Sequence, residues 1–223
     1  MLKAVFFDLG YTLTREVNIS KKIDALLKPY NLDWKKFYPY WKNFYFLRSV
    51  GKIANDKEMF LLLEKIFGRK DIPFRKIRDI VFESHIIPEE SIKVIKEIKK
   101  EYKLGLITNF VHEWAEKILK IKGIYNLFDL ILVSSKIGIR KPNAKLFYIA
   151  LKQFSIKPNE AVFISDDFLS DLICAKGCGI KTIWLDIGVK NKWKKKERKI
   201  AKLFQPDVII KNLTEITSIL KRM

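Results

Sequence analysis

Short apolar runs recur along the chain, and most of them do not alternate with polar residues. The runs occupy residues 3–7, 104–107, 130–133, 161–164, 182–185 and 208–210. Runs rich in Val, Ile and Leu without alternation are typical of strands buried on both faces of a parallel sheet. Between the runs, apolar residues at helical spacing predict helices over 91–102, 113–121, 144–154 and 169–176. This alternation predicts an α/β fold with a parallel sheet and right-handed crossovers.

The stretch between the first two strands departs from this alternation. It contains no good strand, and its pattern predicts helices over 20–27, 33–47, 56–67 and 73–84, with Asp33 and Asp56 as N-caps. We therefore expect an all-helical cap at residues 15–87, inserted into a core formed by residues 1–14 and 88–223. The dense run of aromatic residues between Phe37 and Phe46 is interpreted as packing, in preference to a ligand-binding surface.

The composition is that of a globular protein. The chain has 223 residues, of which 48% are hydrophobic, enough for one large domain or a domain with an insertion. No apolar run reaches the roughly 18 residues of a membrane span, and the N-terminus lacks a signal-peptide pattern. We therefore expect a cytoplasmic protein without a membrane partner. Cys174 and Cys178 lack the spacing of a redox or metal motif and are interpreted as small core residues.

The chain is strongly basic, with 44 Lys and Arg against 25 Asp and Glu and a net charge of +19. Such a charge attracts anions, but a lysine-rich composition is also typical of thermophile surfaces. The sharpest basic run, Lys190–Lys202, places Trp193 and Ile200 at helical spacing and is interpreted as a solvated helix face. No recognised nucleic-acid motif accompanies it, so we do not expect a nucleic-acid partner. The sequence predicts no particular oligomeric state.

Polar and acidic residues follow four of the predicted strands. In chain order these residues are Asp8, Thr108 with Asn109, Lys141, and Asp166, Asp167 and Asp171. Ligands of open α/β sheets bind beyond the carboxyl ends of the strands, so we expect these side chains to meet in one crevice. Clustered carboxylates repel one another unless a cation shares them, and oxygen ligands of this kind suit Mg²⁺. The sequence therefore predicts a magnesium site at this edge of the sheet.

The same residue types support phosphoryl transfer. A carboxylate such as Asp8 can attack phosphorus and form an aspartyl-phosphate. Lys141 would offset the negative charge around that intermediate, and Thr108 with nearby backbone N–H groups would hold the phosphoryl oxygens. Asn109, Arg15 and Arg48 are further candidates for contacts with an anionic substrate. We expect that substrate to be a small phosphorylated metabolite.

Four segments resemble the signature motifs of the haloacid dehalogenase-like (HAD) hydrolase superfamily, subfamily I. They read "FFDLGYTL", "LGLITN", "SSKIGIRKPNAKLF" and "VFISDDFLSDLICAKGCG". The resemblance implies a Rossmann-like core, a helical cap and, in most members, Mg²⁺-dependent phosphoryl transfer. It also implies residue roles. Asp8 is the nucleophile, Thr108 the phosphate-binding hydroxyl and Lys141 the motif-three lysine. The expected metal ligands are Asp8, Asp166, Asp171 and the Gly10 carbonyl, and Asp171, at the second acidic position, binds metal-bound water or orients Lys141.

Gly10 departs from the pattern of this family. Most of its phosphatases have an aspartate there that protonates the leaving oxygen, a role worth about 10²–10⁴-fold in rate. Three hypotheses remain: a Mg²⁺-dependent phosphatase, a 2-haloacid dehalogenase that uses Asp8 without a metal, or a non-catalytic relative that binds anions or nucleic acid. Dehalogenases of the family typically replace the motif-four acids. Because Asp166 and Asp171 are retained, the sequence favours the phosphatase.

Overall fold

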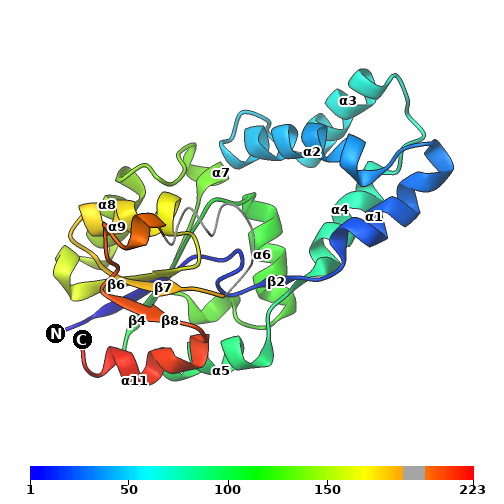
Figure 1. Cartoon of the computed structure of the whole chain (residues 1–223). Helices are drawn as coiled ribbons and strands as arrows, with labels where there is room; N and C mark the ends of the chain where they lie inside the picture. The colour runs from blue at the N-terminus through cyan, green and yellow to red at the C-terminus, as the bar shows by residue number, and fades with distance from the viewer. Residues whose placement is uncertain (188–198) are drawn as a thin grey trace.

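A six-stranded parallel sheet forms the centre of the protein, in the strand order β5-β4-β1-β6-β7-β8 (Figure 1). The structure is a computed structural model and describes residues 1–187 and 199–223. The strands of the sheet are β1 (Ala4–Phe7), β4 (Lys103–Thr108), β5 (Leu130–Val133), β6 (Ala161–Ser165), β7 (Lys181–Leu185) and β8 (Val208–Ile210). The predicted α/β fold with a Rossmann-like parallel sheet is therefore confirmed, with strand boundaries within one residue of the prediction.

Helices cover both faces of this sheet. Those of the core are α5 (Glu89–Ile98), α6 (His112–Ile121), α7 (Ser134–Ile137), α8 (Lys145–Phe154), α9 (Ile173–Gly177) and α11 (Ile216–Leu220). Short 3-10 turns lie at Tyr125–Leu127, Pro158–Glu160 and Leu213–Glu215. Side chains on the two faces of the sheet lie in two separate apolar clusters. Val5 and Phe7 of β1 pack in the cluster shared with α5, α6 and α11, whereas Ala4 and Phe6 pack in the cluster shared with α8 and α9.

The chain order makes the end of β1 a natural binding position. From β1 the chain passes to β4 and β5 on one side, and then crosses to β6, β7 and β8 on the other side. The loop after β1 therefore lies at the point where the direction of winding reverses. In open α/β sheets ligands bind at such a point, beyond the carboxyl ends of the strands.

The segment between β1 and α5 is mainly helical. Its helices are α1 (Ile19–Leu27), α2 (Trp34–Ser49), α3 (Asp56–Phe67) and α4 (Phe74–Ser84), with a 3-10 turn at Lys28–Tyr30. They stand to one side of the sheet and are joined to it through an antiparallel ribbon of β2 (Arg15–Glu16) and β3 (His85–Ile86) (Figure 1). Phe37 is fully buried among the rings of Trp41, Phe67 and Phe74, at centroid distances of 5.6–6.0 Å.

One of the two predicted N-caps is wrong. Asp33 caps α2 as expected, since its side chain accepts a hydrogen bond from the Lys36 N–H. α3 is capped by Asn55, whose side chain accepts from the Glu58 N–H, and Asp56 is the first helical residue. The physical reason is tertiary, because the Asp56 carboxylate bonds to side chains of other helices and is not available to its own backbone.

The predicted helix over 169–176 is divided in two. A π-helical turn spans Phe168–Leu172, and α9 follows it directly. The structure does not describe residues 188–198, so most of the basic run Lys190–Lys202 lies outside the described residues. Within the part of the chain that the structure describes, no helix has the length and apolar character needed to cross a membrane.

Candidate active site

A cavity of about 310 Å³ lies at the carboxyl edge of the sheet, where the loops after β1, β4 and β6 meet the loop that precedes α8. It is lined by Asp8, Gly10, Tyr11, Thr108, Asn109, Phe110, Arg140, Lys141, Asp166, Asp167, Ser170 and Asp171. Seven of the nine residues predicted to form the site, all except Arg15 and Arg48, therefore line a single cavity.

Lys141 connects two of the carboxylates at the centre of this cavity. Its Nζ donates to Oδ1 of Asp8 at 2.7 Å and to Oδ2 of Asp171 at 2.5 Å. The Ser165 hydroxyl also donates to Oδ2 of Asp171, at 2.6 Å. All three charged groups are buried, so their mutual attraction is screened little by water. This chain of contacts fixes the Asp8 carboxylate and leaves its Oδ2 on the side of Gly10.

Burial and charge act in opposite directions on the two bridging groups. Burial alone would lower the pKa of Lys141, but the charges of Asp171 and Asp8 outweigh it and raise that pKa to about 12. Burial raises the pKa of Asp171 to about 8, although Lys141 opposes this effect. Lys141 is therefore a permanent cation at neutral pH, whereas burial favours the protonated form of Asp171.

Asp166 is held at the rim of the cavity by the loop after β1. Its backbone N–H donates to Oγ1 of Thr12 at 3.0 Å, and the same hydroxyl lies 3.4 Å from Oδ1 of Asp166. The indole N–H of Trp184 donates to the Asp166 carbonyl at 3.1 Å. Thr12 is fully buried, and sequence reasoning gave it no role. It ties the Asp8 loop to the Asp166 loop.

Two residues build the loops around the cavity. Asp167 starts the π-helical turn, because its side chain accepts from the Ser170 N–H at 2.9 Å and its own N–H donates to Ser165 Oγ. Asn109 fixes the backbone of Lys141 from both sides: its amide group donates to the Lys141 carbonyl at 3.0 Å and accepts from the Lys141 N–H at 2.8 Å. Asn109 therefore positions the Lys141 loop with its side chain.

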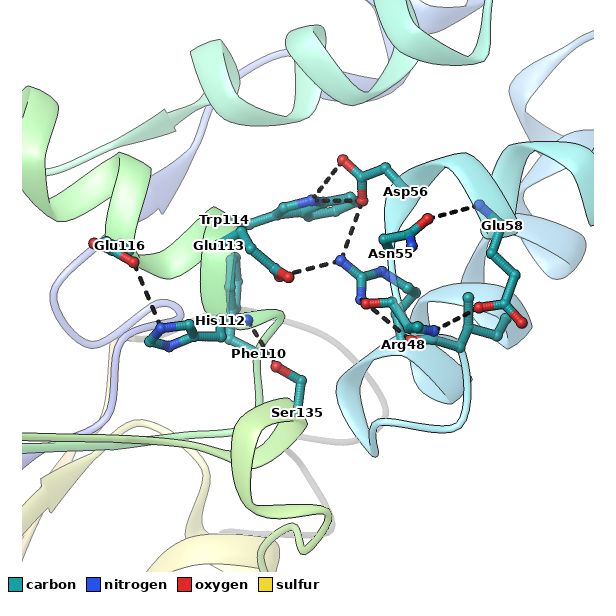
Figure 2. Close-up of polar contacts among 12 residues, drawn as sticks. Arg48, Asn55, Asp56, Glu58, Phe110, His112, Glu113, Trp114, Glu116 and Ser135 are labelled. Atoms are coloured by element: carbon teal, nitrogen blue, oxygen red, sulfur yellow. Dashed lines mark hydrogen bonds and ion pairs between the residues drawn. The ribbon is translucent and has the colours of Figure 1, made fainter.

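Neither of the two arginines predicted to contact substrate lines this cavity. Arg15 donates to the carbonyls of Tyr11, at 2.6 Å, and Thr14, at 2.8 Å, and so closes the loop after β1. Arg48 is 3% exposed, and its guanidinium donates to backbone carbonyls of the helical segment and to Asp56 and Glu113 (Figure 2). Both arginines are therefore used by intramolecular contacts away from Asp8.

Arg140 is the cavity-lining cation that sequence reasoning missed. It donates to the hydroxyl of Ser49, and its guanidinium lies 4.7 Å from the centre of the Phe46 ring. These partners belong to the C-terminal part of α2, so Arg140 joins this cavity to the helical segment. The only sequence signal was its position beside Lys141 in "GIRKPNAKLF".

The donors of this cavity fit a magnesium ion. The lining residues carry four formal negative charges and two positive ones, which would repel a phosphate dianion unless a divalent cation were bound. Among residues 1–187 and 199–223 no three His, Cys, Asp or Glu side chains are arranged to hold a metal. Mg²⁺ needs only one or two carboxylates and completes its shell with water and substrate phosphate. Asp8, Asp166 and the Gly10 carbonyl would supply oxygen ligands of this kind. Asp171, also expected as a ligand, accepts hydrogen bonds from Lys141 and Ser165 through Oδ2.

Comparison with known proteins gives a consistent family. The family model described as "Haloacid dehalogenase-like hydrolase" matches residues 11–185. A glyceraldehyde 3-phosphate phosphatase of Pyrococcus furiosus is 28% identical, over 99% of this chain and 94% of the relative. A phosphoserine phosphatase of Thermus thermophilus is 30% identical over 47% of this chain and 42% of the relative.

Solved structures share the fold at lower identity. Magnesium-bound YfnB of Bacillus subtilis aligns with a TM-score of 0.72 at 20% identity, covering 99% of each chain. The L-2-haloacid dehalogenase of Xanthobacter autotrophicus aligns with a TM-score of 0.69 at 15% identity, covering 100% of each chain. At these identities the structural likeness shows the fold alone.

Proposed function

The chain belongs to the haloacid dehalogenase-like hydrolases, and from this premise we propose that it is a Mg²⁺-dependent phosphatase that hydrolyses a small phosphorylated metabolite through an aspartyl-phosphate on Asp8. The observation that carries the proposal is the contact chain from Asp8 through Lys141 to Asp171, in a cavity that holds two more aspartates. The relatives named as glyceraldehyde 3-phosphate and phosphoserine phosphatases support the same reaction class.

Substrate binding in this proposal uses the groups that line the cavity. The Thr108 hydroxyl and backbone N–H groups of the loop after β4 accommodate the phosphoryl oxygens, and Lys141 and Arg140 supply positive charge. A bound Mg²⁺, held by Asp8, Asp166 and the Gly10 carbonyl, would neutralise the charge on the phosphoryl oxygens. Asn109 holds Lys141 in position beside Asp8, because its side chain bonds to both the N–H and the carbonyl of Lys141.

The reaction proceeds in two displacements at phosphorus. A carboxylate oxygen of Asp8 attacks, the bond from phosphorus to the ester oxygen breaks, and the alcohol leaves with a proton taken from solvent or from the substrate. Water then attacks the aspartyl-phosphate, and inorganic phosphate leaves with Asp8 regenerated. Lys141 stays protonated throughout, since its pKa is raised to about 12. Its hydrogen bond to Asp8 holds the nucleophile in line with the phosphorus atom.

Residues 15–87 act as a cap in this proposal. The ribbon of β2 and β3 is the connection between the helices and the sheet, and Arg140 bonds to α2 from the rim of the cavity. Closure over the cavity would exclude water and select the substrate. The division of the chain into this cap and a core of residues 1–14 and 88–223 is part of the proposal.

Dehalogenation is the second hypothesis that the fold allows, because the Xanthobacter autotrophicus dehalogenase shares it. In that reaction Asp8 would displace halide from a 2-haloacid and would need no metal. The four aspartates of the cavity argue against it, since an anionic haloacid would meet their charge without a compensating cation.

The test compares hydrolysis of p-nitrophenyl phosphate with Mg²⁺, after chelation, and by the Asp8→Asn variant. We expect activity with Mg²⁺ only, and its loss in the variant. Equal rates in all three conditions would end the phosphatase proposal. Chloride release from 2-chloropropionate without Mg²⁺ would instead support the dehalogenase.

A further inference from the structure

A second cavity adjoins the catalytic cavity, between the helical segment and the core. Its volume is about 360 Å³, and Tyr11 and Phe110 line both cavities. The shared residues make the two spaces neighbours. A substrate whose phosphate lies beside Asp8 therefore has room for its alcohol portion in the second cavity.

Aromatic rings of α2 form one wall of this second cavity. Trp34, Tyr38, Trp41 and Tyr45 recur at helical spacing, so they share one face of the helix, and all four line the cavity. Sequence reasoning assigned this aromatic run to packing. Phe37, on the neighbouring face, does pack in the core, but the other stripe borders an open space.

Two aromatic rings of the core adjoin this face of α2 and are firmly held. The Trp114 ring stacks on Trp41 at 6.0 Å, and its indole N–H donates to Asp56 at 3.0 Å (Figure 2). The Phe110 ring meets the Tyr45 ring edge-on at 5.9 Å. Rings that are fixed in this way bind a flat ligand with little loss of conformational freedom.

The polar groups at one end of this cavity are already satisfied by one another. The Tyr11 hydroxyl donates to Glu16 at 2.6 Å, and Nε2 of His85 lies 3.4 Å from the other Glu16 oxygen. Nδ1 of His85 lies 2.6 Å from the Val81 carbonyl. Tyr11 has a left-handed backbone (φ 52°), and Arg15 donates to its carbonyl. The Tyr11 ring is thus held at the border between the cavities. Apart from Glu16, the charged residue of the lining is Lys42, an exposed residue of α2.

We infer that the preferred substrates are phosphomonoesters whose alcohol carries an aromatic ring close to the phosphate, and that the ring binds among the aromatic residues of α2 and α6. This inference rests on the proposed phosphatase function. The volume suffices, because an apolar cavity of about 150 Å³ already holds benzene. The glyceraldehyde 3-phosphate phosphatase of Pyrococcus furiosus is named for a substrate that would leave this surface unfilled.

Gly10 supports the same substrate class independently. A glycine cannot protonate the leaving oxygen, so the chain favours alcohols that leave easily without a proton. Phenols are better leaving groups than sugar or glycerol hydroxyls. The residue at the catalytic position and the lining of the second cavity therefore point to the same chemistry.

The test uses benzyl phosphate and glycerol 3-phosphate, because both release a primary alcohol and differ in the ring. We expect kcat/KM to be at least about 10-fold higher for benzyl phosphate. Tyr38→Ala should lower that value about 3- to 10-fold. Tyr40→Ala is the matched control, since Tyr40 lies on the same helix with 42% exposure against 44% for Tyr38 but does not line the cavity. Tyr40→Ala should change the turnover of neither substrate.

Equal kcat/KM values for benzyl phosphate and glycerol 3-phosphate, or equal losses of kcat/KM in Tyr38→Ala and Tyr40→Ala, would overturn the inference. The phosphatase proposal would still stand in that case if the protein hydrolyses p-nitrophenyl phosphate. A calorimetric comparison of benzylphosphonate with methylphosphonate decides the inference without turnover. Binding of benzylphosphonate at least about 10-fold tighter, and weakened by Tyr38→Ala alone, supports the aromatic site even if no ester is hydrolysed. Equal binding of the two phosphonates would refute it.

Discussion

Replacement of Arg48 by methionine should destabilise the protein without changing its affinity for substrate. The Arg48 guanidinium is buried and donates to the carbonyls of Ile53 and Ala54 at 3.2 and 2.8 Å. It also pairs with Asp56 at 3.3 Å within the helical segment, and with Glu113 at 3.1 Å across the junction to α6 (Figure 2). Methionine keeps the aliphatic packing of the side chain but supplies no donor.

The magnitude follows from the groups that lose a partner. Each carbonyl left without a donor costs about 1–3 kcal/mol. The Glu113 side chain is 59% exposed, so water replaces its partner at small cost. Asp56 keeps its bonds to Arg78 and Trp114. Loss of about 3 kcal/mol in a chain of 223 residues corresponds to a fall in Tm of about 6–12 °C.

The measurement is thermal unfolding followed by circular dichroism, with Lys100→Met as the control. Lys100 pairs with Glu97 at 2.6 Å, but the two side chains are 68% and 51% exposed, so its loss should cost at most about 1 kcal/mol. KM for p-nitrophenyl phosphate, measured well below both Tm values, should be unchanged in Arg48→Met. An unchanged Tm together with a tenfold rise in KM would refute the reasoning and would indicate that Arg48 contacts the substrate.

Three further outcomes are expected. Gly10→Asp should accelerate hydrolysis of alkyl phosphates at least about tenfold, because a Cβ at this position meets nothing closer than 3.9 Å and the new carboxyl supplies a proton donor; Gly10→Asn is its control in the same assay. Gly105→Ala should lower the free energy of unfolding in urea by about 1–3 kcal/mol, since its Cβ would collide with the Phe6 ring. Although burial raises the pKa of Asp207, hydrogen bonds from Thr182 hold it below its ordinary value. Its contribution to the free energy of unfolding should therefore be complete at neutral pH and be lost progressively as the pH falls below about 4. Chemical unfolding should show Asp207→Asn to be less stable than the wild type at neutral pH, with the difference shrinking in acid.

Much of the fold and the cavity could be predicted because the relevant signals are local in sequence. A strand buried on both faces has no polar face to maintain, so Val5 and Phe7 leave an uninterrupted apolar run that is easily recognised. Parallel strands bring their carboxyl ends to one edge, so Asp8, Thr108 and Asp166 could be grouped before any coordinates were available. The sheet topology brings the strand ends together, so a residue that directly follows a strand can be assigned to the cavity from its position in the sequence.

The remaining features depended on tertiary contacts that no short pattern contains. Asp56 reads as an N-cap by residue type, but its carboxylate bonds to Arg48 and Trp114, and Asn55 takes the capping role. Arg48 resembles a surface or substrate arginine until its backbone acceptors are known. An aromatic stripe at helical spacing has the same sequence pattern whether it meets a packed core or a cavity, so Tyr38 could not be assigned.

Tyr11 couples substrate choice to the chemistry at Asp8. It directly follows Gly10 in the loop that begins with Asp8, and its hydroxyl bonds to Glu16 in the ribbon that leads to the helical segment. A group bound in the second cavity would therefore contact the same loop that carries Asp8, the proposed nucleophile. Its binding energy then acts on alignment at phosphorus as well as on affinity. Substitutions on the cavity face of α2 should for this reason lower kcat together with kcat/KM for an aromatic substrate. Loss of a substrate contact that is equally strong in the ground state and the transition state would instead raise KM alone.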